Sequence, residues 1–279
     1  MIYNINRRKF IELFSYSCCG LILPSCSTVP ITERRQLSIY PESTINNSAS
    51  KAYQVFKTKN KLVTSGNQLD SVMEIGKRIE FAVSKFFLKK DGKDPTSHFQ
   101  WEYILVDNDK VKNAWCMPGG KIAVYTGILK VTKNDNALAA VMGHEIAHAV
   151  AKHSVERASQ ALTVNLGAQV ADIFLGGAIS RTRNTIGQNS GMDIFQLGIF
   201  NPFGRKQETE ADYLGLIFSS LAGYDIRESV KLWERMAQSN KGKEPPQFMS
   251  THPSSKNRII NLNKWITEVM VSYPPIKRG

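Results

Sequence analysis

The chain has 279 residues, of which 42% are hydrophobic, and this is enough for one sizeable core in one or two domains. Its formal net charge at pH 7 is +12, which is typical of proteins that contact nucleic acids or anionic membranes. The Lys and Arg residues are dispersed, without a run of five or an aromatic-interleaved RNA-binding motif. We therefore expect no nucleic-acid partner and favour a surface that faces an anionic membrane.

Residues 1–25 are predicted to be a lipoprotein-type signal peptide and not part of the fold. The basic stretch NRRKF precedes a moderately apolar run, FIELFSYSCCGLIL, which is too short to span a bilayer comfortably. Leu23, Ser25 and Cys26 then resemble a bacterial lipobox, which implies cleavage before Cys26 and lipidation of its thiol. An uncleaved amphipathic leader with a chance cysteine is the alternative.

Residues 26–50 are polar, and we predict that they form an extended, lipidated tether ahead of a folded domain over residues 51–279. Once the leader is removed and Cys26 carries lipid, Cys116 is the one cysteine left, so no disulfide within the chain is possible. Cys116 has apolar neighbours and no basic partner nearby in the sequence. It is predicted to pack as a small hydrophobic side chain and not to act as a nucleophile.

Hydrophobic periodicity predicts the secondary structure of the folded domain. Apolar residues recur at helical spacing over 67–87, and the segments 99–108 and 121–127 have the pattern of strands. The Gly-, Ser- and Asn-rich residues 176–204 predict a long loop, which is a lid, a membrane-touching flap or a disordered segment. Further helices are predicted over 134–152, 157–175, 206–222, 226–238 and 255–271. The pattern predicts a mainly helical α+β fold with one small sheet.

The helix predicted over 134–152 carries ionisable side chains within an apolar sequence, AAVMGHEIAHAVAKH. Because a helix turns by about 100° per residue, His144 and His148 lie about 40° apart on one face, with Glu145 beside them. This is the H-E-x-x-H pattern, in which two histidines bind zinc and the glutamate acts as a general base. His153 lies about 180° from His144 on the same helix, so we expect it to point away from the metal.

A catalytic zinc ion needs a third protein ligand and one open position for water. The segment GRKQETEADYLGL, residues 204–216, is predicted to begin a helix in which Glu208 and Asp212 share a face while Glu210 points to the other side. Glu208 is the candidate ligand, and Asp212 is a candidate acceptor for the other ring N–H of a ligating histidine. A solvated acidic helix face is the alternative when this segment is taken alone.

Three segments together, HEIAH, RKQETEAD and STHPSSKNRI, resemble one family. The chain is similar to the gluzincin metallopeptidases of the HtpX-like and CAAX-prenyl-protease-like group, metallopeptidase family forty-eight, including its lipoprotein members. The resemblance covers approximately residues 30–270 and implies a zincin-like fold. It also implies one zinc ion per chain, held by His144, His148 and Glu208, the last being the first residue of the E-x-x-A-D pattern.

The resemblance implies roles for three further segments. It places His252, in the His-Pro segment, at the active-site cleft, where the imidazole donates to the oxyanion or closes over zinc as a reversible fourth ligand. A surface turn is the alternative for this histidine. Arg258 is expected to hold that segment or to bind substrate. Asn113 and Ala114 begin a segment that is expected to be an edge strand, which pairs with an extended substrate peptide.

These residues predict a zinc-dependent endopeptidase in which zinc activates a water molecule and Glu145 takes its proton. Recognition through the peptide backbone suits unfolded or misfolded envelope polypeptides, so we expect a role in quality control. Cys26 implies a lipid anchor on the periplasmic side of a bacterial envelope membrane, and the outer membrane is favoured. A zinc-stabilised chaperone or assembly scaffold with little turnover is the alternative, although a scaffold has no need of Glu145.

Overall fold

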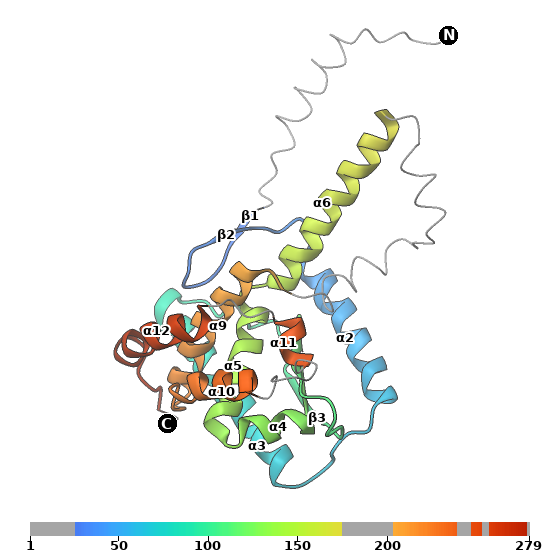
Figure 1. Ribbon diagram of the computed structural model, residues 1–279. Coiled ribbons are helices and arrows are strands. Elements are labelled where there is room, and N and C mark those ends of the chain that lie inside the picture. Colours follow the sequence, from blue (N-terminus) through green and yellow to red (C-terminus); the bar gives the residue numbers. More distant parts are fainter. Residues whose placement is uncertain (1–25, 175–202, 239–246, 253–256, 278–279) are drawn as a thin grey trace, which may run out of the picture.

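The structure is a computed structural model that describes residues 26–174, 203–238, 247–252 and 257–277 (Figure 1). The predicted leader and most of the predicted loop over 176–204 lie outside the described residues. In chain order the elements are β1 (Cys26–Thr28), β2 (Arg35–Leu37), α2 (Glu42–Lys59), α3 (Asn67–Asp91), β3 (Glu102–Val106), β4 (Ala114–Met117), β5 (Lys121–Tyr125), α4 (Thr126–Thr132), α5 (Asp135–Val150), α6 (His153–Phe174), α9 (Arg205–Leu221), α10 (Glu228–Gln238), α11 (Gln247–Thr251) and α12 (Arg258–Ser272). The mainly helical α+β class is confirmed.

The helices and strands that carry strong apolar patterns lie where the sequence predicts them. They are α3, α5, α6, α9, α10, α12, β3 and β5. The described residues contain the predicted small sheet, which has three strands, and in addition a separate two-stranded hairpin that was not predicted. No helix in these ranges is both long and apolar enough to cross a lipid bilayer.

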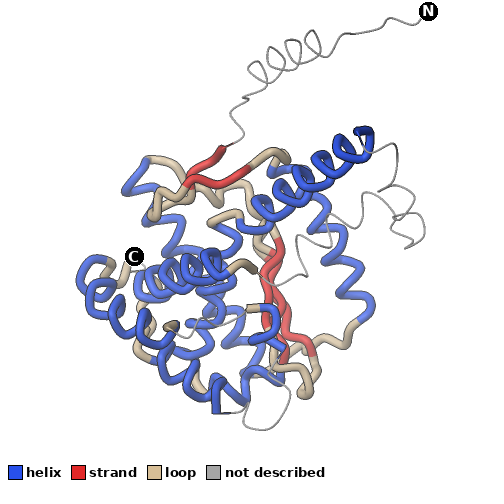
Figure 2. The backbone as a smooth tube through the Cα atoms, turned by 45° about the horizontal axis from the view of Figure 1, so that its top comes forward, coloured by secondary structure: helices blue, strands red, loops and turns tan. Residues whose placement is uncertain are grey.

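The three-stranded sheet has the order β3-β5-β4, with β3 parallel and β4 antiparallel to β5. Because successive side chains of a strand point to opposite faces, each face packs against a different layer. Leu105 and Val124 belong to the main core, whereas Ile104 and Ala123 pack with Tyr53 of α2. Figure 2 shows helices on both sides of this sheet. Strand β4 lies at an edge of the sheet, as expected for the segment that begins at Asn113.

The predicted extended tether over 26–50 is wrong for this structure. Strands β1 and β2 pair as an antiparallel hairpin, and α2 begins at Glu42 with Ile45 and Ala49 buried. The predicted boundary between residues 50 and 51 falls inside α2. The polar composition misled the prediction because charged side chains hold the hairpin to the rest of the fold, with Arg34 paired to Glu156 and Glu210.

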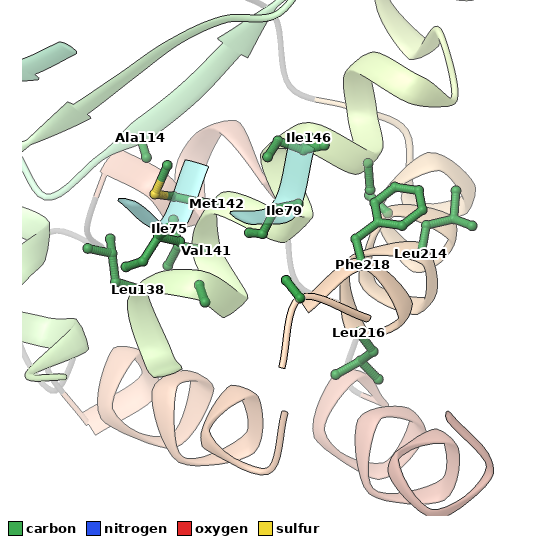
Figure 3. Packing of buried hydrophobic residues seen from close by; sticks show 14 of the residues in the cluster. Ile75, Ile79, Ala114, Leu138, Val141, Met142, Ile146, Leu214, Leu216 and Phe218 are labelled. Atoms are coloured by element: carbon green, nitrogen blue, oxygen red, sulfur yellow. The ribbon is translucent and has the colours of Figure 1, made fainter. Parts of the chain in front are cut away.

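The main core joins α3, α5, α9 and the sheet. Figure 3 shows Ile79 of α3, Met142 and Ile146 of α5, and Leu214 and Phe218 of α9 packed together. All five side chains are fully buried. Burial of such a side chain stabilises the fold by about 1.5–3 kcal/mol, so this cluster fixes α5 against α9.

The helices α5 and α9 cross at a pair of glycines. A methyl group added to Gly143 would lie 2.4 Å from Ser219 Oγ, and one added to Gly215 would lie 2.9 Å from the backbone nitrogen of His144. Only glycine permits this approach of one backbone to the other. The crossing therefore brings the H-E-x-x-H face of α5 next to the acidic face of α9.

We predict that Gly215→Ala lowers the stability of the protein. Alanine favours an isolated helix by about 1 kcal/mol over glycine, but overpacking a close helix contact costs about 1–3 kcal/mol. Thermal unfolding should therefore show a lower melting temperature. Gly204→Ala is the matched control, since the nearest atom to the added methyl is Gln207 Oε1 at 3.8 Å. A higher melting temperature for Gly215→Ala would contradict the close crossing.

Candidate metal centre

Four side chains from three parts of the chain converge on one buried point. His144 and His148 come from consecutive turns of α5, Glu208 from the first turn of α9, and His252 from the residue after α11. Each of them is buried, and one ligand atom from each lies within 4.8 Å of the others. The structure thus brings together the three predicted ligands and adds His252 to the same cluster.

Four of the distances between these atoms are close to the edge length of a coordination tetrahedron. Metal–ligand bonds of about 2.0–2.1 Å place tetrahedral ligand atoms about 3.3–3.4 Å apart. His144 Nε2 lies 3.0 Å from His148 Nε2 and 3.2 Å from His252 Nδ1. Glu208 Oε1 lies 3.3 Å from His148 Nε2 and 3.0 Å from His252 Nδ1. Three imidazole nitrogens and a carboxylate are donors that suit zinc, so this site fits one zinc ion.

The charges within the cluster also favour a bound cation. Burial lowers the pKa of His148 well below its usual value, so the ring is neutral, which is the form that binds metals. Burial alone would also lower the pKa of His144, but its bonds to Asp212 and Glu208 raise that pKa to about 9. Burial opposes ionisation of Glu208, yet the neighbouring histidines hold its pKa well below the ordinary value. A metal ion can take the place of the proton that His144 carries beside the ionised Glu208.

Asp212 lies behind His144, as the helical spacing predicted. Its Oδ1 is 3.0 Å from His144 Nδ1, on the side of the ring away from the cluster. A carboxylate in this position selects the tautomer whose Nε2 is free to bind metal.

Arg258 lies inside the site and holds both carboxylates of α9. Its Nε donates to Asp212 Oδ2 at 2.6 Å, and its Nη2 donates to Glu208 Oε2 at 2.7 Å. The guanidinium stacks over the Trp233 ring at 3.8 Å, and only 2% of the residue is exposed. The assignment of Arg258 to substrate binding is therefore wrong in this geometry. The other expected role, that Arg258 holds the segment containing His252, agrees better with the structure, because Nη1 also contacts the carbonyl oxygen of His252 at 3.4 Å.

Glu145 is almost fully buried beside the cluster. Its Oε1 lies 3.2 Å from His252 Nε2 without a well-aligned hydrogen bond. Burial raises the pKa of Glu145, and the neighbouring His252 partly opposes this effect. A carboxylate with a raised pKa is suited to accept a proton and to release it again near neutral pH.

His252 is not the exposed turn residue that was the alternative for it. It is 2% exposed, and its ring stacks against Phe248 with centroids 4.5 Å apart. Pro253, which follows it, lies outside the described residues. Its Nδ1 faces the ligand cluster while its Nε2 faces Glu145, so the imidazole fills the space between the cluster and that carboxylate.

The expectation that His153 points away from the metal is wrong. Helix α5 ends at Val150, and Lys152 takes a left-handed conformation with φ of 57°, so α6 starts in a new direction. His153 Nδ1 therefore lies 2.8 Å from His148 Nδ1. Glu210 does lie on the other side of α9 from Glu208, as predicted, and it contacts His153 Nε2 at 2.9 Å. No local sequence signal marked this turn, because Lys152 is neither glycine nor proline.

The start of the edge strand is covered by α11. Asn113 Oδ1 accepts a hydrogen bond from Ala114 N at 3.0 Å, and both residues are buried. The backbone nitrogen of Phe248 donates to Lys112 O at 3.2 Å, so α11 lies against this end of β4. Cys116 on β4 is buried with its thiol pKa raised by burial, which confirms that it is a packed side chain.

Comparison with known proteins assigns the chain that builds this site to a family. Residues 77–266 match peptidase family M48, and the chain belongs to this family. It is 39% identical over 179 residues to the mitochondrial metalloendopeptidase OMA1 of Schizosaccharomyces pombe, covering 63% of this chain and 49% of the relative. The OMA1 of Saccharomyces cerevisiae is 36% identical over 181 residues, covering 62% and 49%. The beta-barrel assembly-enhancing protease of Yersinia pestis is 27% identical over 163 residues, covering 57% and 33%.

The resemblance to metallopeptidase family forty-eight and its zincin-like fold is thus confirmed, whereas the narrower HtpX-like lipoprotein branch stays a prediction. The chain spans about half the length of the OMA1 relatives from the two yeasts. The predicted location on the periplasmic side of a bacterial outer membrane is contradicted. Both yeast relatives, which share more identity with this chain than the Yersinia pestis protease does, are mitochondrial metalloendopeptidases and point away from that membrane.

We predict that Asp212→Ala weakens zinc binding by about 10–100-fold, because His144 loses the carboxylate that fixes its tautomer. Competition with a chromophoric chelator measures this affinity directly. Asp225→Ala is the control, since that carboxylate pairs with Arg227 near the surface, away from the cluster. Equal zinc affinity in wild type and Asp212→Ala would show that the contact with His144 does not support a metal ligand.

Proposed function

We propose that the protein is a zinc-dependent endopeptidase that cleaves unfolded or misassembled polypeptides in protein quality control. The observation that carries the proposal is the convergence of His144, His148 and Glu208 beside a buried Glu145. A structural zinc site has no need for a general base at that point. The names of the relatives, metalloendopeptidase and assembly-enhancing protease, support the same class of reaction and a role in protein assembly.

In this proposal His144, His148 and Glu208 hold the zinc ion. When bound, zinc polarises the scissile carbonyl and lowers the pKa of a water molecule. Glu145 takes the proton of the attacking water at Oε1 and passes it to the leaving amine, a transfer that its raised pKa favours. Arg258 keeps the Glu208 carboxylate oriented throughout, since it is buried and bonded to it.

Substrate is held by the edge of the sheet. Among the described residues β4 pairs with β5 alone, so in this proposal an extended peptide binds along its other edge once the segment that covers the strand moves away. Pairing of this kind reads the backbone and not the side chains, so it selects segments that are unfolded. The strand ends beside the metal cluster, because Cys116 of β4 makes a backbone hydrogen bond to Glu145. Asn113 and Ala114 therefore keep their proposed place at the substrate strand.

The segment that contains α11 and His252 closes this site. His252 Nδ1 occupies the fourth position of the cluster, and Phe248 contacts the start of the edge strand at Lys112. One movement of the segment would therefore uncover the metal and the strand together. We propose that His252 is a reversible latch that also donates to the oxyanion when the segment moves.

A second candidate function is a zinc-stabilised chaperone or assembly scaffold with little turnover. The position of His252 in the cluster favours it, because a permanent fourth protein ligand is typical of structural zinc sites. The two candidates differ in whether the protein cleaves substrate.

We expect the wild type to cleave casein, and Glu145→Gln to lower the rate by about 10²–10⁴-fold while its zinc content stays unchanged. The substitution removes the base and leaves every proposed ligand in place. Glu234→Gln is the matched control, because Glu234 is an exposed glutamate on α10. A wild type that binds zinc without cleaving casein, with or without added metal, would support the scaffold. Near-normal cleavage by Glu145→Gln would exclude Glu145 as the base.

We expect His252→Ala to cleave casein faster than the wild type, because the fourth position of the cluster becomes free for water. A loss of about 10²–10³-fold would instead show that donation to the oxyanion outweighs any restraint by His252, and would overturn the latch. His98→Ala provides the control, since His98 is an exposed histidine that contacts Glu42. Unchanged rate and zinc affinity would remove His252 from the site.

The lipid anchor predicted at Cys26 stays a proposal. The thiol is exposed at the start of β1, so it is accessible to modification. Metabolic labelling with a fatty-acid analogue tests it, since label that persists in Cys26→Ser would exclude this attachment site.

A further inference from the structure

A buried chain of hydrogen-bonding groups connects His148 to the N-terminal hairpin. His148 Nδ1 contacts His153 Nδ1 at 2.8 Å, and His153 Nε2 contacts Glu210 Oε2 at 2.9 Å. Glu210 then accepts hydrogen bonds from Arg34 Nε at 2.8 Å and from the hydroxyl of Thr32. The side chains of His148, His153 and Glu210 are between 0% and 6% exposed, so water has little access to the chain.

The proton positions along this chain follow from its first member. When His148 binds a metal through Nε2, its Nδ1 must carry the ring proton, and this N–H donates a hydrogen bond to His153 Nδ1. His153 then holds its own proton on Nε2 and donates it to the Glu210 carboxylate. Each ring therefore has one allowed tautomer. Every hydrogen bond in the series is donated in the direction from His148 toward the Glu210 carboxylate.

Arg34 fixes the outer end of the chain. Its two Nη atoms donate to Glu156 of α6 at 2.8 and 2.9 Å, while its Nε donates to Glu210 of α9. One guanidinium thus neutralises two carboxylates that are buried close together, an arrangement that costs several kcal/mol without a cation. Figure 1 shows the hairpin lying near the first turns of α6 and α9.

The two histidine ligands are consequently supported in two different ways. His144 contacts the carboxylate of Asp212 directly, at 3.0 Å. His148 reaches the carboxylate of Glu210 only through His153. In the direct case a carboxylate fixes the tautomer and raises the basicity of the ligand. The same effect can pass through one imidazole, because each ring transmits the orientation of its proton to the next.

We propose that Arg34, Glu210 and His153 are positioning residues for His148, so that the N-terminal hairpin sets how tightly the site binds zinc. The inference rests on the proposed zinc site. It assigns a function to residues 26–37, which pack on α6 and α9 and contribute no ligand. A purely structural role for the hairpin would change the stability of the fold without changing the metal ligands.

The test is zinc affinity of the full chain, measured by competition with a chromophoric chelator, together with the visible spectrum of the Co²⁺-substituted protein. We expect His153→Phe to weaken zinc binding by about 10–100-fold and Arg34→Met by a smaller factor, and both to alter the cobalt bands. Arg35→Met is the matched control, because it removes the same charge from an exposed neighbour. Arg34→Lys should restore part of the affinity, since one ammonium can bind Glu210 but cannot hold two carboxylates at once.

A double-mutant cycle distinguishes the proposed hydrogen-bond relay, which runs from Arg34 through Glu210 and His153 to His148, from a purely structural role of these residues. In the His153→Phe background the hydrogen bonds between His148 and Glu210 are already lost. Arg34→Met should therefore have almost no further effect on zinc affinity. Additive losses, or wild-type affinity and cobalt spectra with only a lower melting temperature, would overturn the proposal. Thr32→Val gives a milder change if the other variants do not fold. A wild type that binds no zinc would overturn the metal site itself, whereas a wild type that binds zinc with unaffected variants would overturn only the relay.

Discussion

The close crossing of α5 and α9 is the constraint on which the site depends. Gly143 and Gly215 leave no room for side chains between the two backbones, and the nearest atoms to an added methyl are 2.4 and 2.9 Å away. At this separation Glu208 and Asp212 reach the imidazoles of His144 and His148 with short side chains. The contacts of Arg258 and His252 with the cluster also depend on this packing of α5 against α9.

Burying so many carboxylates requires cations on both sides of the cluster. Arg258 pairs with Glu208 and Asp212 on one side, and Arg34 pairs with Glu156 and Glu210 on the other. Removing Arg258 from its fully buried pairs costs about 3–5 kcal/mol. Arg34 is half-buried, but it neutralises two buried carboxylates and so also stabilises the fold. The hairpin and the start of α12, which lie far apart in sequence, are thereby tied to the same pair of helices.

The sequence predicted the parts of the site that repeat within one helix. His144, Glu145 and His148 follow from the helical period, and Glu208 and Asp212 follow from theirs. His153 could not be placed, because the left-handed turn at Lys152 ends α5 without a glycine or proline to mark it. The hairpin was missed for a different reason, since Arg34 holds it through ion pairs and not through an apolar pattern. Contacts between distant segments, such as His252 with Glu208, depend on the tertiary fold, so the family resemblance of its segment placed His252 and no periodic pattern did.

X-ray absorption at the zinc edge of the purified full chain tests the central claim, that these helices build a zinc site from imidazole and carboxylate groups. We expect one zinc ion per chain, with nitrogen and oxygen ligands at about 2.0–2.1 Å and the outer-shell scattering of imidazole rings. An absence of zinc after supplementation, or a sulfur ligand at about 2.3 Å, would contradict it.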